Sequence, residues 1–224
     1  MRLRLVVFDV DGTLVDSQAS IVAAMTGAFG AEGLPVPDRA AILSIVGLSL
    51  DHAMLRLVPE LAAETRARLV EGYKAAYHAH RLAQGAAHSP LFPGIGDMLE
   101  RLAARPEVLI GVATGKSRRG LDALIEAHGL ERYFVTRQVA DDHPSKPHPA
   151  MLLAALDEAG VGADAAVMVG DTSYDMDMAQ AAGVTGLGVS WGYHAPEALS
   201  NAASVIHQIG DLPMALERIW EMTE

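Results

Sequence analysis

Short apolar runs alternate with amphipathic stretches over most of the 224 residues. Runs of branched aliphatic residues bounded by turn residues predict buried strands. These runs are Leu5–Phe8, Val108–Ala113, a short segment near Phe134, Ala166–Val169, Val184–Val189 and Val205–Ile206. Apolar residues at helical spacing predict helices at Ile95–Ala104, Arg118–Gly129, Ala150–Ala159, Asp177–Ala182 and Leu212–Glu221. The alternation predicts an α/β fold with right-handed crossovers and a doubly wound parallel sheet.

One long stretch after the first strand departs from this alternation. Residues 17–90 contain no strand candidate, and their pattern predicts helices only. The predicted helices are Ser17–Gly33, Arg39–Val46, Leu50–Leu57 and Ala62–Leu82, followed by a loop at Gly85–Pro93. We therefore expect an α/β core made of residues 1–16 and 91–224, interrupted by a small all-helical insert at residues 17–90.

The composition narrows the classes of function. The chain has no cysteine, which excludes disulfides and thiolate chemistry, and half of its residues are hydrophobic, as in a globular protein. A formal net charge of −11 argues against a general nucleic-acid binder. No apolar run is long enough for a membrane span, and the apolar run near the start is too short for a signal peptide. We expect a cytoplasmic protein, monomeric or homodimeric, with no nucleic-acid or membrane partner.

Two carboxylates follow the first strand directly, in the stretch Phe8-Asp9-Val10-Asp11-Gly12. At strand spacing, Asp9 and Asp11 point to the same side, at the carboxyl end of a strand, where open α/β sheets bind ligands. Two like charges at such a short distance repel each other, so the pair needs a divalent cation, a shared proton, or both. We therefore expect the two carboxylates to converge on a reactive site.

Three further stretches fall at the ends of predicted core strands. Thr114 and Gly115 precede a helix whose first N–H groups suit an anion, although an ordinary helix cap explains them equally well. Lys146 lies in the proline-rich stretch 144–149, which would hold its ammonium group at low entropic cost. Asp171 ends a strand and Asp175 follows it, and carboxylates are typical Mg²⁺ ligands. For Asp175, a surface acidic loop is the alternative.

In this order, the four stretches resemble the motifs of the haloacid dehalogenase superfamily, in the subgroup that has a helical cap inserted after the first strand of a Rossmann-like core. The matching motifs are Asp9-x-Asp11-Gly12-Thr13, Thr114-Gly115, Lys146-Pro147 and Gly170-Asp171-x-x-x-Asp175. Within the superfamily, the chain looks most like the phosphoglycolate phosphatases and their relatives. The resemblance covers nearly the whole chain.

The resemblance implies a Mg²⁺-dependent phosphatase that works through an aspartyl-phosphate. Asp9 would attack phosphorus, and Asp11 would protonate the leaving alcohol and then take a proton from the hydrolytic water. Asp9, Asp171 and the backbone carbonyl of Asp11 would bind the metal. Asp175 would orient metal-bound waters or Lys146.

Other residues would contact the substrate. The Thr114 hydroxyl, the Gly115 N–H and Lys146 would hold the phosphate oxygens. In the cap, the turn at Gly47 would face the substrate. Arg56, just beyond this turn, could bind a substrate carboxylate, with a solvated helix arginine as the alternative.

Several functional alternatives remain at this point. A sugar phosphomutase of the β-phosphoglucomutase type would keep both Asp9 and Asp11, and a non-catalytic phosphate-dependent binder could use the same fold. Dehalogenases need no acid at Asp11, so this residue argues against them. We expect a small phosphorylated metabolite as the substrate, with 2-phosphoglycolate as the first candidate.

Overall fold

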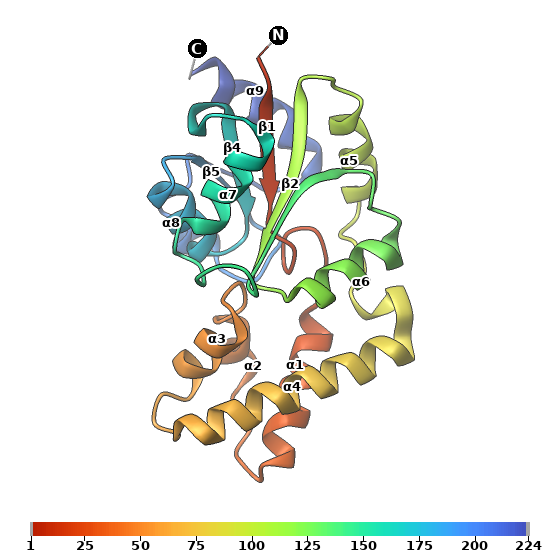
Figure 1. Ribbon diagram of the computed structural model, residues 1–224, viewed down its shortest axis with the longest axis vertical. Coiled ribbons are helices and arrows are strands. Elements are labelled where there is room, and N and C mark those ends of the chain that lie inside the picture. The colour runs from red at the N-terminus through yellow and green to blue at the C-terminus, as the bar shows by residue number, and fades with distance from the viewer. Residues whose placement is uncertain (1, 223–224) are drawn as a thin grey trace.

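The computed structural model describes residues 2–222, which are organised around a six-stranded sheet in which all neighbouring strands run parallel. Its order is β3-β2-β1-β4-β5-β6. The strands are β1 (Arg4–Phe8), β2 (Val108–Thr114), β3 (Phe134–Val139), β4 (Ala166–Gly170), β5 (Thr185–Val189) and β6 (Ser204–Ile206). The helices around the sheet are α5 (Ile95–Ala103), α6 (Arg118–His128), α7 (Ala150–Ala159), α8 (Ser173–Ala181) and α9 (Leu212–Glu221). They cover both of its faces (Figure 1), so the predicted doubly wound α/β fold is confirmed.

The apolar run of β1 explains why both faces are covered. Successive side chains of a strand point to opposite faces. Val6 and Phe8 pack in a cluster with α5, α6 and α9, whereas Leu5 and Val7 pack in a second cluster with α7 and α8. All four side chains are buried, so β1 needs apolar residues at every position rather than at alternate ones.

The strand order places a crevice at the end of β1. β1 lies between β2 and β4, so the order of strands reverses on its two sides. Phe8 pairs with Val112 of β2 and with Val169 of β4, which aligns the carboxyl ends of the three strands. The next residue, Asp9, donates its N–H to the Val169 carbonyl at 2.9 Å. This reversal point is where doubly wound sheets bind their ligands.

Four helices between β1 and β2 lie beyond the carboxyl ends of the strands (Figure 1). They are α1 (Gln18–Ala31), α2 (Arg39–Leu43), α3 (Leu50–Leu57) and α4 (Ala63–Gln84), and they share an apolar cluster of their own. The chain enters and leaves this insert through paired segments, since Asp16 N–H donates to the Pro90 carbonyl and Phe92 N–H to the Leu14 carbonyl. Within residues 2–222, no helix is both long and apolar enough to cross a membrane. The predicted division at residues 17 and 90 falls beside this pairing, but the division into two units stays a prediction.

Two helices differ from the sequence-based prediction. α8 begins at Ser173 rather than at Asp177, because Thr172 and Asp175 form a capping box in which each side chain accepts the other's backbone N–H. α2 ends at Leu43 rather than at Val46. The chain then turns towards Gly47, whose φ of 98° does not fit a helix.

His88 is buried where the chain leaves the insert. Its Nδ1 lies 2.9 Å from the Ser20 hydroxyl, which donates to the His88 carbonyl, so Nδ1 must be the donor to Ser20. The Tyr77 ring packs edge-on against the imidazole at 4.5 Å. Nε2 is buried without a hydrogen-bond partner. Burial, together with the positive charge of Lys116, lowers the pKa of His88 to about 4.

We expect acid to destabilise the fold partly through His88. The folded-state pKa of about 4 lies below the ordinary value of 6.5, so the unfolded chain binds the proton first. The stability that the neutral ring contributes is therefore complete above about pH 6.5 and is lost as the pH falls towards 4. Calorimetric melting between pH 7 and 5 should show a smaller loss of Tm in His88→Gln than in the wild type. His52→Gln, which changes an exposed histidine of the insert, is the control. Equal pH slopes for His88→Gln and the wild type would contradict this assignment.

Candidate active site

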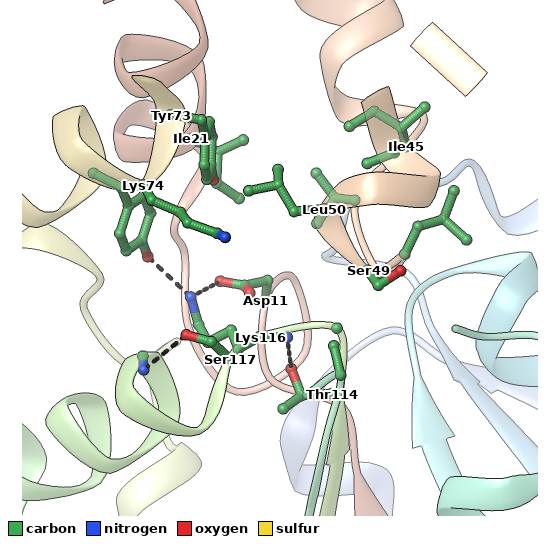
Figure 2. A pocket seen from close by; sticks show the side chains of 18 of the residues that line it. Asp11, Ile21, Ile45, Ser49, Leu50, Tyr73, Lys74, Thr114, Lys116 and Ser117 are labelled. Carbon is green, nitrogen blue, oxygen red and sulfur yellow. Dashed lines mark hydrogen bonds and ion pairs between the residues drawn. The ribbon is translucent and has the colours of Figure 1, made fainter. Parts of the chain in front are cut away.

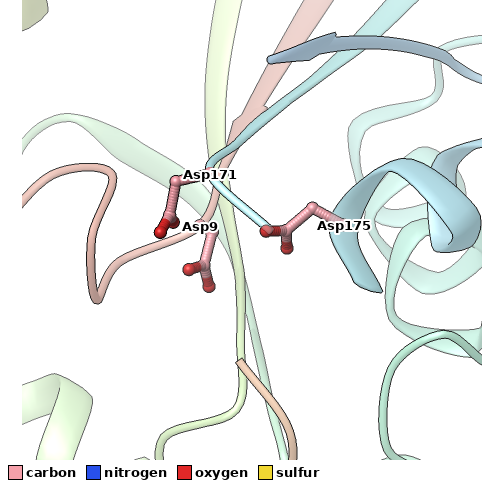
Figure 3. Close-up of side chains that lie close together, drawn as sticks. All are labelled: Asp9, Asp171 and Asp175. Carbon is pink, nitrogen blue, oxygen red and sulfur yellow. The ribbon is translucent and has the colours of Figure 1, made fainter. Parts of the chain in front are cut away.

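Three buried carboxylates meet at the carboxyl ends of β1 and β4. Oxygen atoms of Asp9, Asp171 and Asp175 all lie within 4.8 Å of one another (Figure 3). Asp9 follows β1, Asp171 follows β4, and Asp175 lies in the first turn of α8. The sequence predicted that Asp9 and Asp171 come together, and the crossover between the two strands brings this about.

Lys146 neutralises part of this acidic cluster. Its Nζ donates to Asp9 Oδ1 and to Asp175 Oδ1, both at 2.6 Å, and its side chain is fully buried. Burial alone would lower the pKa of Lys146, but the charges of Asp175 and Asp9 outweigh it, so the pKa lies above its ordinary value. Lys146 is thus a permanent cation fixed between two acids.

Asp9 retains an unsatisfied atom. Its Oδ1 accepts from Lys146, whereas its Oδ2 is buried and has no hydrogen-bond partner among the described residues. Burial raises the pKa of Asp9 to about 7; Lys146 opposes this rise, and the charges of Asp175 and Asp11 add to it. An unpaired buried carboxylate oxygen is costly, so Oδ2 marks the place for a further cation or an electrophile.

Asp171 is fixed on both sides. Its Oδ1 accepts from the Thr13 hydroxyl and its Oδ2 from the Tyr193 N–H, each at 2.8 Å. A Cβ on Gly12 or on Gly192 would lie 2.2 Å from an Asp171 atom, so only glycine fits against this carboxylate at either position. Burial, with the charges of Asp9 and Asp175, raises the pKa of Asp171 well above its ordinary value. This packing holds a carboxyl group where only a nearby cation would keep it charged.

Asp175 has both oxygens occupied. Oδ1 accepts from Lys146, and Oδ2 accepts from the Thr172 N–H at 3.0 Å and from the Thr172 hydroxyl at 2.7 Å. The contact between Asp175 and Lys146 is required if Asp175 orients Lys146, which is one of its predicted roles. Asp175 is therefore part of the first turn of a helix, not of a surface acidic loop.

The acidic cluster fits a small hard cation. Its donors are all carboxylate oxygens, Asp9 Oδ2 is unpaired, and Mg²⁺ prefers one or two carboxylates together with substrate oxygens and waters. Asp9 and Asp171 would hold the ion, as the sequence predicted. The backbone carbonyl of Asp11 stays a predicted ligand.

The Asp11 side chain is not one of the three clustered carboxylates, although it lines the same cavity as Asp9. The strand ends at Phe8, so strand spacing does not continue to Asp11. Asp11 Oδ1 instead accepts from Lys116 Nζ at 2.9 Å and from the Ser17 hydroxyl. Asp11 therefore faces the beginning of the insert.

Lys116 is a site residue that the sequence analysis missed. Its ammonium contacts Asp11 of the core and donates to the Tyr77 hydroxyl of α4 at 2.9 Å (Figure 2). Its side chain is 9% exposed. Burial opposes the charge, but Asp11 and Tyr77 outweigh it, and the pKa of Lys116 is raised. In the sequence, the position of Lys116 directly after Thr114-Gly115 was the signal that could have identified it as a site residue. Lys116 links the core to the insert.

Thr114 and Gly115 both line the cavity, and Gly115 lies against the insert. Thr114 is the buried last residue of β2, and its Oγ1 accepts from the Lys116 N–H at 3.2 Å. A Cβ on Gly115 would lie 2.5 Å from the Leu48 carbonyl oxygen and 2.6 Å from that of Gly47. The predicted substrate-facing turn at Gly47 therefore meets the core at Gly115.

Core and insert together enclose a cavity of about 470 Å³ whose floor includes Asp9, Asp11 and Thr114. Figure 2 shows Ile21, Leu50 and Tyr73 of the insert on the side opposite this floor. Arg56 does not line the cavity: it is exposed, and its guanidinium lies 5.4 Å from the centre of the Tyr174 ring. The structure thus favours the alternative of a surface arginine.

Tyr193 contacts two parts of the site. Its N–H donates to Asp171, and its hydroxyl accepts from the Ser17 N–H at 2.9 Å. Nothing in its local sequence predicted these contacts, because they join residues far apart in the chain.

The comparisons agree with this geometry. The family model that describes haloacid dehalogenase-like hydrolase sequences matches residues 6–189. The chain belongs to the haloacid dehalogenase-like hydrolase family. It is 39% identical over 201 residues to the probable phosphatase IndB of Dickeya dadantii, covering 88% of this chain and 86% of that protein. It is 34% identical over 220 residues to the phosphoglycolate phosphatase of Yersinia pestis, covering 96% and 93%.

A solved hydrolase from Pseudomonas syringae superposes with a TM-score of 0.84 at 27% identity, covering 97% of this chain and 99% of that one. The predicted class, a phosphoric monoester hydrolase, is confirmed at the level of the family and of relatives that are named phosphatases.

We expect Lys146→Met to destabilise the folded protein strongly. Removal of one partner from a buried ionic cluster leaves uncompensated charge and typically costs about 3–5 kcal/mol. Urea unfolding at pH 7 in the presence of a chelator measures the loss. Lys74→Met, which removes an exposed lysine paired with Glu71, is the control and should change stability by less than about 1 kcal/mol. A similarly small effect of Lys146→Met would show that the cluster does not depend on this cation.

Proposed function

We propose that the protein is a Mg²⁺-dependent phosphatase that hydrolyses a small phosphorylated metabolite through an aspartyl-phosphate. The observation that supports this most is the asymmetry of Asp9. Lys146 fixes one oxygen of the carboxylate, and the other is buried, unpaired and part of the acidic cluster. A carboxylate held by one oxygen and free at the other is suited to in-line attack.

The reaction would proceed in two transfers. A carboxylate oxygen of Asp9 attacks phosphorus, the bond from phosphorus to the alcohol oxygen breaks, and an acyl phosphate forms on Asp9. Asp11 gives a proton to the departing alkoxide and then takes one from the water that attacks phosphorus in the second transfer. That water releases phosphate and restores Asp9.

To do this, the Asp11 carboxyl group has to turn from its present contacts towards the leaving oxygen. It is bound to Lys116 and Ser17, on the insert side of the cavity. Lys116 would remain beside Asp11 as a fixed positive charge that attracts the anionic substrate.

The remaining groups would hold the phosphate. The Thr114 hydroxyl and the Gly115 N–H supply donors at the end of β2, and Lys146 supplies a charge that stays in place throughout. Mg²⁺, when bound by Asp9 and Asp171, would offset the repulsion between the phosphate and the carboxylates.

2-Phosphoglycolate is the first candidate substrate, because relatives with 30–34% identity are named phosphoglycolate phosphatase. No contact in the site favours the phosphomutase alternative. Incubation with a β-hexose 1-phosphate, assayed for the 6-phosphate against free phosphate, separates the two. A cytoplasmic location, a monomeric or homodimeric state and the lack of a nucleic-acid or membrane partner stay predictions.

We expect Asp9→Asn to lower kcat by at least about a thousandfold, because an amide oxygen cannot form the acyl phosphate. Release of phosphate measures turnover, and far-UV circular dichroism checks the fold. Asp97→Asn, which changes an exposed acid on α5, is the control. Substantial residual activity of Asp9→Asn would remove Asp9 as the nucleophile.

Removal of divalent cations should abolish turnover, and Mg²⁺ should restore it. Binding to the folded state should also raise Tm, independently of activity. Asp171→Asn should lose most of this Mg²⁺-induced rise, whereas Asp97→Asn should keep it. Full activity in excess chelator, or an unchanged rise in Asp171→Asn, would contradict the assigned metal site.

A further inference from the structure

A group of basic side chains lines the same cavity as Asp9 and Asp11. His78 and Arg81 lie on α4, Arg119 lies on α6, and all three line the cavity. Arg81 Nη2 lies 3.0 Å from His78 Nδ1, and Arg119 Nη2 lies 3.1 Å from His78 Nε2. Two guanidinium groups from different helices are thus held on either side of one imidazole.

This arrangement has more donors than acceptors. A neutral imidazole has one acceptor nitrogen and a protonated one has none, whereas guanidinium nitrogens only donate. At most one of the two arginines can therefore hydrogen-bond to His78. Partial burial and the charges of Arg119 and Arg81 lower the pKa of His78, so the ring does not add a charge of its own.

Among the residues that the structure describes, no acid forms an ion pair with either arginine. Asp141, which also lines the cavity, accepts from the Arg118 N–H. Two arginines without a carboxylate partner line one cavity of a chain with a net charge of −11, and each guanidinium can bind a carboxylate or phosphate through two N–H groups.

The insert also contributes a group of apolar side chains to the lining of this cavity, beside the polar Ser49, Asp51 and Lys74. The apolar side chains are those of Ile21, Met25, Ile45, Leu48, Leu50 and Tyr73. The volume of about 470 Å³ falls in the range typical of sites for ligands larger than glycolate. A molecule that spans this cavity would meet acids and a threonine at the floor, apolar side chains along the wall, and arginines.

We propose that Arg81 and Arg119 bind a second anionic group of the substrate, a carboxylate or a phosphate, separated from the scissile phosphate by an apolar segment. This rests on the proposed phosphatase function and narrows its substrate class. 2-Phosphoglycolate, in which one methylene carries both groups, is then a shorter member of the class than the cavity accommodates.

The test compares esters that differ only at the far end. Hexane-1,6-diol bisphosphate and 6-phosphonooxyhexanoate carry a second anion, and hexyl phosphate does not. The wild type should prefer the first two over hexyl phosphate in kcat/KM. In the double variant Arg81→Gln/Arg119→Gln, this preference should fall about tenfold, mainly through KM. Arg68→Gln, which changes an exposed arginine of α4 paired with Glu32, is the control and should keep it.

The possible outcomes identify the second anion or overturn the proposal. A greater loss for the bisphosphate than for the carboxylate identifies a phosphate as the second anion, and the reverse identifies a carboxylate. An equal loss for hexyl phosphate, or no preference in the wild type, would overturn the proposal while leaving the phosphatase intact.

Absence of turnover with every ester would instead count against the proposed function. Calorimetry in the Asp9→Asn background then measures binding of the bisphosphate without turnover. Binding that the two arginine substitutions weaken about tenfold supports the anion site, and unchanged binding refutes it.

Discussion

The site depends on one buried ammonium group between carboxylates. Lys146 contacts Asp9 and Asp175 at 2.6 Å each, and Asp171 lies in the same cluster. One lysine cannot balance three ionised acids, so burial raises the pKa of Asp9 and Asp171, and the cluster favours a divalent cation that would keep them charged. Under the proposed function, the same cation would let an anionic phosphate approach Asp9. Stability and chemistry therefore impose the same requirement on these residues.

Close backbone packing sets where this charge lies. Gly12 and Gly192 approach Asp171 so closely that a Cβ at either position would overlap it, and Gly115 approaches the carbonyls of Gly47 and Leu48 in the same way. The first contact fixes a carboxylate in the core. The second lets the insert cover the end of β2, so that one cavity has walls from both parts of the chain. Larger side chains at these positions would separate the parts that the site needs together.

The sequence predicted the site residues that follow the ends of core strands. It missed the side-chain contacts that form where the insert meets the core. Asp9 and Asp171 follow apolar runs, and parallel strands bring such positions to one edge. The capping box of Thr172 and Asp175 was also visible in the sequence, and using it would have moved the start of α8 from Asp177 to Ser173. The contacts of Lys116 with Tyr77, and of Tyr193 with Ser17, join elements far apart in the chain. No local pattern encodes them, because side-chain direction there depends on packing.

Two groups of residues that line the cavity come largely from different parts of the chain. The floor residues follow core strands and fit a reaction that needs only a phosphate ester, a cation and water. The basic groups at α4 and the apolar wall come largely from the insert, where no recognised motif lies. Under the proposed function, a change there would alter which alcohol fits without altering how phosphorus is attacked. An identity of 34% to a phosphoglycolate phosphatase therefore establishes the chemistry better than the substrate. With a chain charge of −11 repelling anions overall, the proposed anionic substrate would have to be selected by the local placement of cations in this cavity.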